Sequence, residues 1–408
     1  MSINRNMTLN AYPPAHSNGR DANLEIVAVL DLMCQEIELP PSRVDDARDR
    51  YETVGRVLAS EGSALYEYRP RVYAQGSIGL GTTVKPLKTH EFDVDLACAF
   101  ALRPSSDPNE VKRAVFSMLN NHPHYKGKVE TKARCVQLTY ADEFHMDIMP
   151  CVPASGTNVH VPDKRAGGWV LSNPEGYAEK FHETTKELPR RRTELVSLSN
   201  RAMMEAKQAS VDPFPEFDSL NKMPLQRCVQ LEKRHRDKMF YEDKSKAPSS
   251  IIITTLTVYS YAYAVRNNRY DHPLELMIDV VEELPNFIKV IPLGSGVTEY
   301  IVPNPVLPSE NFASKWKEDK ELPENFYAWQ QRAAKTLRRL AEMEGIGLNE
   351  LGRQLGSDYG QDSANTAIRR FSKAIEESSR EGNLQIITNT STLAPQGYRV
   401  SRHTNFGA

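Results

Sequence analysis

The stretch QGSIGLGTTVKPLKTHEFDVDLACAF, residues 75–100, constrains the fold more than any other part of the chain. It begins with a Gly-Ser pair in a glycine-rich turn and ends in an apolar segment that carries two aspartates, Asp93 and Asp95. Side chains on a strand alternate between its two faces, so both aspartates point one way and the apolar residues between them point the other. The segment therefore predicts a strand with one face toward a core and the other lined by carboxylates.

A third aspartate falls in a similar pattern. In FHMDIMPCV, residues 144–152, Asp147 lies between two apolar residues, and the preceding CVQLTY, residues 135–140, predicts the other strand of a hairpin. Three carboxylates on neighbouring strands repel one another unless a cation compensates them. We therefore expect Asp93, Asp95 and Asp147 to bind two Mg²⁺ ions, for which Mn²⁺ can substitute.

The glycine-rich turn supports this interpretation. An isolated Asp-x-Asp is most often the polar face of a half-exposed strand. Here GSIGLGTT, residues 76–83, adds backbone N–H groups and hydroxyls that suit phosphate. No Gly-Lys-Ser/Thr follows, so the turn is not a P-loop, and its glycines do not have the spacing of a dinucleotide fingerprint.

Composition excludes several classes of protein. The chain has 408 residues, of which 40% are hydrophobic and 25% charged, as in soluble proteins of one or two domains. A net charge of −2 argues against a protein whose whole surface binds nucleic acid. The five scattered cysteines form no CxxC pair, and the N-terminus lacks the apolar core of a signal peptide. We expect a cytoplasmic protein with no membrane association.

The second half of the chain is mostly helical in pattern. We expect helices at 224–240, 325–345 and 363–379, from apolar residues recurring at helical spacing. The segment APSSIIITTLTVYSYAYAV, residues 247–265, is ambiguous because its β-branched residues favour a strand. Its length and serine-rich start favour a buried helix, which we prefer.

Several motifs together carry a family resemblance. The Gly76-Ser77 pair, an Asp-x-Asp strand 16 residues after Ser77, and a third aspartate in HMDIMP resemble the polymerase-β-like nucleotidyltransferases. Within that superfamily, five motifs between about residues 70 and 260 resemble the bacterial cGAS/DncV-like nucleotidyltransferases (CD-NTases) of CBASS anti-phage systems: GSIGLGTTVKP, FDVDL, FHMDIMPCVP, WVLSNPEGYAEKF and VQLEKRHRDKMF…APSSIIITTL.

The resemblance implies an α+β fold. A polymerase-β-like core, a mixed sheet with flanking helices, would pack on a helical C-terminal lobe with a central cleft between the two. The expected divisions are a disordered N-terminus, the catalytic core, the helical lobe and a flexible C-terminal tail, at residues 1–20, 21–175, 176–385 and 386–408.

The resemblance also implies an activity. Asp93, Asp95 and Asp147 would be catalytic and bind metal, Asp147 would help to deprotonate the acceptor ribose hydroxyl, and Gly76 and Ser77 would bind the donor triphosphate. The enzyme would condense ATP, possibly with a second NTP, into a cyclic oligonucleotide second messenger. We favour an adenine-rich cyclic trinucleotide.

Basic and hydroxyl side chains of the helical lobe are further candidates for the triphosphate site. Lys233, Arg234 and Arg236 suit phosphate, and the spacing leaves open which of them binds it. Ser249 and Ser250 would add hydroxyl contacts at the start of the next helix. The alternative is that these cations form an ordinary solvated helix face.

Two other functions stay open, together with the partners. The chain could add nucleotides to RNA or to a protein, or it could be a non-catalytic nucleotide-binding scaffold. The family offers two protein partners: a ubiquitin-transfer-like enzyme that acts on the C-terminal Ala408, or a HORMA-type regulator. A downstream effector would be reached only through the product.

Overall fold

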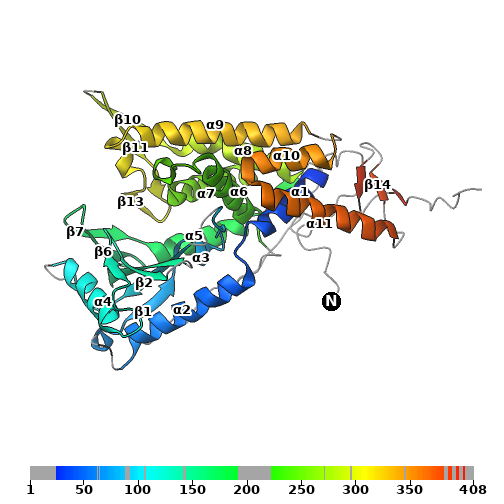
Figure 1. The fold of residues 1–408 in the computed structure, drawn as a ribbon. Coiled ribbons are helices and arrows are strands. Elements are labelled where there is room, and N and C mark those ends of the chain that lie inside the picture. Colours follow the sequence, from blue (N-terminus) through cyan, green and yellow to red (C-terminus); the bar gives the residue numbers. More distant parts are fainter. Residues whose placement is uncertain are drawn as a thin grey trace, which may run out of the picture.

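The computed structural model describes residues 24–191 and 222–380, apart from short gaps at 62, 64, 88–91, 105–106, 141–143, 271, 295 and 344–345, together with three short strands between 385 and 399. Figure 1 shows two lobes, a sheet with its helices below and a set of packed helices above. The expected α+β fold, a mixed sheet with flanking helices packed on a helical lobe, is confirmed.

A mixed sheet forms the first lobe. Its strands β1, β2, β5, β4 and β3 lie side by side in that order, and β6 and β7 extend the sheet from the far end of β5. The strands are β1 (Arg71–Ala74), β2 (Asp93–Ala99), β3 (Val129–Thr131), β4 (Val136–Tyr140), β5 (Phe144–Pro153), β6 (Val159–Asp163) and β7 (Gly168–Ser172). The predicted β4–β5 hairpin is confirmed by antiparallel pairing of Tyr140 with Phe144.

One face of this sheet is buried by two helices. These are α2 (Pro41–Ala59) and α4 (Asn109–Asn121). Val94, Leu96 and Ile148 pack into the core beneath them, and all three side chains are fully buried. The aspartates alternate with these residues, so the other face of the sheet is left for the site.

Most of the second lobe is helical. Its elements are α6 (Pro224–Met239), α7 (Ser250–Asn267), α8 (Pro273–Glu283), α9 (Glu321–Ala341), α10 (Leu348–Tyr359) and α11 (Gln361–Arg380). The prediction that the ambiguous apolar segment is a helix is confirmed by α7. Between the lobes lie α3 (Gly76–Leu80) and α5 (Pro174–Thr185), the latter capped by the Asn173 side chain, which accepts from the Gly176 N–H.

The second lobe also contains β-hairpins, and the sequence patterns did not predict these hairpins. Strand β10 (Lys289–Gly294) pairs with β11 (Val297–Ile301), and β12 (Pro303–Asn304) pairs with β13 (Leu307–Asn311). The β10–β11 hairpin projects from one end of the lobe (Figure 1). The short strand β8 (Arg190–Arg191) pairs in parallel with β9 (Arg269–Tyr270).

The N-terminal helix packs with the second lobe although it precedes the sheet in sequence. Helix α1 (Leu24–Glu36) shares one apolar core with α6, α9 and α10, and Arg370 of α11 binds Glu36 at 2.6 Å. Residues 1–20 lie outside the described residues. Of the C-terminal segment, β14 (Gln385–Ile387), β15 (Thr392–Ala394) and β16 (Tyr398–Arg399) are described, and they pair with one another.

No helix in the described ranges combines the length and the apolar character that crossing a membrane requires.

Candidate active site

The three predicted aspartates lie on two adjacent strands. Strands β2 and β5 run parallel, and their register sets Asp95 directly beside Asp147 and Asp93 beside His145. Burial alternates along both strands, with the apolar residues inside and the aspartates on the open face. The predicted carboxylate cluster on one face of the sheet is therefore present.

Gly76 meets this cluster at the start of α3. Its φ is +59°, and a Cβ at Gly76 would lie only 2.9 Å from Cγ of Asp95 and closer still to Oδ2. The Gln75 N–H also donates to the Asp95 carbonyl at 2.9 Å. Only glycine fits a backbone so close to a carboxylate, so the Gly-Ser turn and the aspartates form one site.

Ser77 is the second residue of α3, and two hydrogen bonds from the segment after α3 hold it in place. The Thr83 hydroxyl donates to Ser77 Oγ at 3.4 Å, and the Thr82 N–H donates to the Ser77 carbonyl at 2.9 Å. The turn from Gly76 to Thr83 thus closes back on itself beside the carboxylates.

The electrostatics of the site centre on Asp95. Burial, together with the carboxylates of Asp93 and Asp147, raises the pKa of Asp95 to about 7, and Lys233 opposes that rise. Burial, with Arg236 beside it, lowers the pKa of the Lys233 ammonium to about 7. Anions crowded on a partly buried face favour a bound cation.

The donor chemistry of this cluster fits Mg²⁺, which prefers carboxylate oxygens and keeps positions for phosphate and water. Asp147 is oriented by Gln137, whose Nε2 donates to Asp147 Oδ1 at 2.8 Å. No three His, Cys, Asp or Glu side chains converge as a ready-made ligand set within the described ranges. Ligands from a bound nucleotide would complete such a site.

The predicted residues of the helical lobe fall into two groups. Lys233 is buried and reaches the turn, where its Nζ donates to Thr82 Oγ1 at 3.1 Å. Arg236 instead joins α6 to α7, since its Nη1 donates to Ser250 Oγ at 2.9 Å. Ser249 is the N-cap residue of α7. Arg236 also donates to the Pro248 carbonyl at 2.9 Å and pairs with Asp237 at 2.6 Å, so it is held within the helical lobe.

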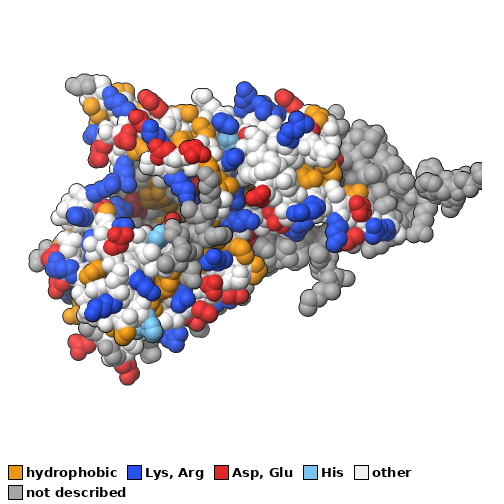
Figure 2. All heavy atoms as spheres, viewed as in Figure 1, with side chains coloured by type: hydrophobic (Ala, Val, Ile, Leu, Met, Phe, Trp, Pro, Cys, Tyr) orange, Lys and Arg blue, Asp and Glu red, His pale blue; other side chains and the backbone are white. Residues whose placement is uncertain are grey.

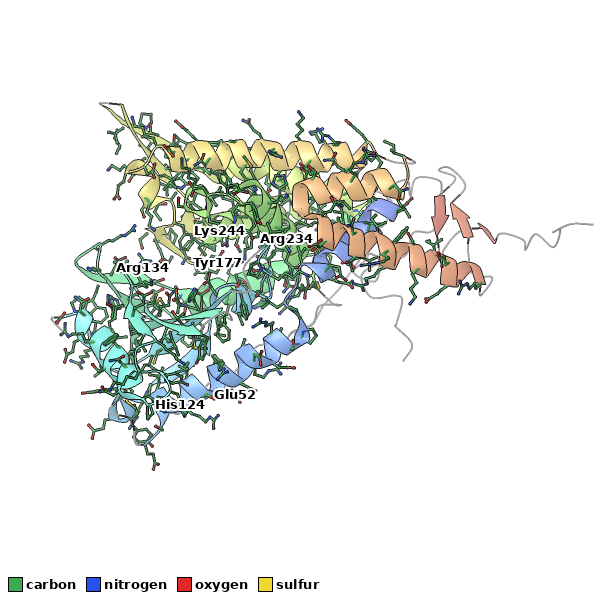
Figure 3. All side chains as sticks on the ribbon, viewed as in Figure 1. Glu52, His124, Arg134, Tyr177, Arg234 and Lys244 are labelled. Carbon is green, nitrogen blue, oxygen red and sulfur yellow. The ribbon has the colours of Figure 1, made fainter. Side chains whose placement is uncertain are left out.

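Arg234, the third basic candidate, points into the helical lobe (Figure 3). Its side chain is 1% exposed and burial lowers its pKa to about 10. Lys233 is nearly as enclosed, but it contacts Thr82 of the turn and its charge acts on Asp95, so the structure favours Lys233 over Arg234 as the cation nearest the aspartates.

A hollow separates the two lobes, and both basic and acidic side chains lie around its rim (Figure 2). At one end the lobes are joined through Glu310 of β13, which accepts from Ser172 Oγ at 3.0 Å and lies 3.7 Å from Arg134 Nη1. Arg134 stands at the edge of the sheet lobe that faces this hollow (Figure 3). The basic side chains of this rim suit an anionic substrate.

Comparison with known proteins agrees with this geometry. Residues 25–184 match the Second Messenger Oligonucleotide or Dinucleotide Synthetase (SMODS) domain. A c-di-GMP synthase of Roseivirga ehrenbergii is 28% identical over 330 residues, which are 80% of this chain and 82% of that protein. The cyclic dinucleotide synthase CdnG of Bradyrhizobium diazoefficiens is 24% identical over 407 residues, 93% of this chain and 94% of that one.

Two solved structures share the fold. The CD-NTase CdnG of Bradyrhizobium diazoefficiens, in complex with GTP, superposes with a TM-score of 0.62 at 22% identity, covering 84% of this chain and 97% of its own. Escherichia coli MS115-1 CdnC, in a complex with HORMA-deltaN, superposes with a TM-score of 0.54 at 14% identity, covering 79% and 93%. Residues 25–184 are therefore similar to the SMODS domain, and the chain shares the fold of CD-NTases and resembles cyclic dinucleotide synthases in sequence.

Proposed function

We propose that this nucleotidyltransferase condenses nucleoside triphosphates into a cyclic dinucleotide, with GTP as a substrate. The observation that carries the proposal is the register of Asp95 beside Asp147, with Gly76 packed against Asp95. The preference for GTP and for a dinucleotide rests on the relatives, one named a c-di-GMP synthase and another a cyclic dinucleotide synthase.

Each condensation forms a bond between a ribose hydroxyl oxygen and an α-phosphorus and breaks the bond to the leaving pyrophosphate. The turn at Gly76 and Ser77 binds the donor triphosphate in this proposal, and Lys233 adds positive charge near it. Asp147, oriented by Gln137, accepts the proton of the attacking hydroxyl. A second attack, with donor and acceptor exchanged, closes the ring and releases the second pyrophosphate.

Asp93, Asp95 and Asp147 would hold two Mg²⁺ ions, or Mn²⁺ in their place. When bound, such ions neutralise charge on the phosphates and lower the pKa of a coordinated hydroxyl. The protein's own part is to hold the two nucleotides in line and to keep the carboxylates in register.

The wider setting belongs to the same proposal. We place the enzyme in the cytoplasm, in anti-phage signalling of the CBASS type, with an effector reached through the product. A HORMA-type regulator is one partner to test, because CdnC is solved with one. The other, a ubiquitin-transfer-like enzyme, would act on Ala408, which lies outside the described residues.

The test is a substrate-omission assay. Purified protein is incubated with Mg²⁺ and α-labelled GTP, ATP, CTP and UTP, singly and in mixtures, and labelled product that resists phosphatase is separated. The proposal predicts such product from mixtures that contain GTP, and none from an Asp93→Asn, Asp95→Asn double variant.

Other outcomes decide between the alternatives. Product from ATP alone would contradict the GTP preference and favour the adenine-rich cyclic trinucleotide expected from the sequence. Label transferred to added RNA or to the protein would favour the other nucleotidyltransferase reaction. Nucleotide binding without product, even with a HORMA-type partner added, would favour a scaffold.

A further inference from the structure

In the second half of the turn from Gly76 to Thr83, five consecutive backbone carbonyls each accept a hydrogen bond from a side chain of another segment. From residue 79 to residue 83, the donors are His182 at 3.0 Å, Gln226 at 3.0 Å, Lys222 at 2.6 Å, Lys233 at 3.3 Å and Gln230 at 3.2 Å. We name these five bonds the carbonyl ladder. Residues 79 and 80 end α3 and residues 81–83 lie in no helix or strand, so these carbonyls need partners from outside regular secondary structure.

Four of the five donors come from α6 or from the segment that leads into it. Gln226, Gln230 and Lys233 follow one another at steps of four and three, which places them along one face of α6, and Lys222 lies two residues before the helix begins. Lys222 is 6% exposed, Lys233 5% and Gln230 fully buried. Polar side chains at such depth require partners, and here the turn supplies them.

The fit between turn and helix is close. Gly81 has a φ of +64°, and a Cβ there would lie 2.7 Å from Gln226 Nε2 and 3.2 Å from Lys222 Nζ. The next residue, Thr82, is bonded back to the Ser77 carbonyl at 2.9 Å. A shift of α6 would therefore displace Ser77 through bonds that run without interruption.

Gln230, one donor of the carbonyl ladder, is itself held by the buried ion pairs of Arg227. Gln230 Oε1 accepts from Arg227 at 3.2 Å, and Arg227 binds Glu38 at 2.7 Å and Asp31 of α1 at 3.1 Å. Gln230 Nε2 also donates to Glu38 at 3.3 Å. The position of the turn is thus tied to α1 as well as to α6.

We infer that Gln226 and Gln230 are positioning residues for the donor-triphosphate turn, and that the carbonyl ladder sets the placement of Gly76 and Ser77 against Asp95. The inference rests on the proposed function, since it takes this turn to bind a triphosphate. By holding the carbonyls toward α6, the ladder fixes the backbone between Gly76, which packs against Asp95, and Thr83, whose hydroxyl donates to Ser77 Oγ.

The test replaces Gln226 so that its hydrogen bond to the turn is lost while its hydrogen bond to Met223, at the start of α6, is kept. Gln226 Oε1 accepts from the Met223 N–H at 2.9 Å, and its Nε2 donates to the Leu80 carbonyl. Gln226→Glu keeps the first bond and loses the second. Gln331→Glu, at an exposed position of α9, makes the same change of charge away from the turn and serves as the control.

Two readouts separate positioning from general stability. We expect Gln226→Glu to weaken binding of a non-hydrolysable, α,β-methylene GTP analogue with Mg²⁺ by about tenfold in calorimetry, as the loss of one buried bond predicts. Hydrogen exchange of the peptide covering residues 76–83 should accelerate while that of α6 does not. Gln226→Met, which removes both bonds without adding charge, should weaken binding in the same way.

The outcomes are distinguishable. If Gln226→Glu and Gln226→Met bind the analogue as tightly as Gln331→Glu does, the inference is wrong, whatever the product assay gives. If the wild type binds the analogue and the variants do not, but no cyclic product forms, the proposed function fails and the ladder stands. A wild type that binds no triphosphate would overturn both.

Discussion

Gly76 lies against the carboxylate of Asp95, with no room between them for even a methyl group. Gly76 begins the turn that we assign to the donor triphosphate, and burial together with its carboxylate neighbours raises the pKa of Asp95. In the proposed function, this contact would couple phosphate binding to the carboxylates through one backbone position. It also defines a substitution with a clear expected effect.

Gly76→Ala should remove activity and destabilise the protein by about 1–3 kcal/mol, because it combines a left-handed backbone with overlap on Asp95. Gly127→Ala is the matched control, since Gly127 has a φ of +80° and nothing within 4 Å of its added Cβ. Thermal melts and product formation should separate the two. Equal activity of both variants would show that the contact with Asp95 does not matter.

Asp95→Asn should abolish product formation and flatten the dependence of stability on pH. Burial and neighbouring carboxylates raise the pKa of Asp95 to about 7 from an unfolded value of 3.8, so the folded state holds the proton more tightly. The metal-free wild type should therefore lose stability as pH rises from about 4 to about 7, and the neutral amide should not. Melting temperatures at pH 5 and pH 8 without metal measure this difference.

Glu232→Gln should have a similar effect on the dependence of stability on pH. Glu232 is buried in the helical lobe, where Thr257 donates to one of its oxygens and the other accepts no hydrogen bond from the described residues. Burial raises the pKa of Glu232 to about 8 from 4.5, so its contribution to stability is lost as pH rises between these values.

At pH 9 the Glu232→Gln variant should be more stable than the wild type by about 1–2 kcal/mol, and at pH 5 the two should agree. Urea unfolding at both pH values measures the difference. Glu324→Gln, at an exposed position of α9, is the control and should change little at either pH. A pH-independent effect of Glu232→Gln would refute the assignment of the buried proton.

Arg227→Met should be strongly destabilising, by about 3–5 kcal/mol, because it leaves Glu38 and Asp31 without their buried cation. Arg338→Met removes a pair with Glu282 that lies at the surface and should cost about 1 kcal/mol or less. Chemical unfolding of both variants gives the comparison. Similar losses for the two would mean that α1 is not anchored through Arg227.

Much of the site could be predicted from the sequence, because strand alternation is a local property. The faces of Asp93, Asp95 and Asp147 follow from the apolar residues between them, and the structure agrees. The start of α5 follows from its Asn-Pro cap for the same reason. These features depend on a few neighbouring residues and on little else.

Other features depend on contacts between distant segments and could not be predicted in this way. The pairing of α1 with α11 joins segments more than 300 residues apart, as the Arg370 bond to Glu36 shows. Gln137 and Gln226 resemble ordinary polar residues until the strand register and the turn are known. Strand β10 could not be predicted because it contains Pro292, and proline within an apolar run argues against a strand.

One feature of the carbonyl ladder can be seen in the sequence, namely the spacing of its donors on α6. Its donors on α6 recur at helical spacing beside the apolar stripe of the same helix, which is a regular polar face at buried positions. Sequence alone does not distinguish such a face from a solvated one, because burial of the helix on both sides is a tertiary property.

The most direct test of the central claim is the amount of pyrophosphate released per nucleoside triphosphate consumed by the purified enzyme with Mg²⁺. Ring closure converts every triphosphate into a linkage, so a cyclic product requires one pyrophosphate for each nucleotide used. A linear dinucleotide keeps one triphosphate end and releases one pyrophosphate for every two nucleotides. We predict the equal ratio, together with its loss in the Asp95→Asn variant; the half ratio, or an active Asp95→Asn variant, would contradict the account.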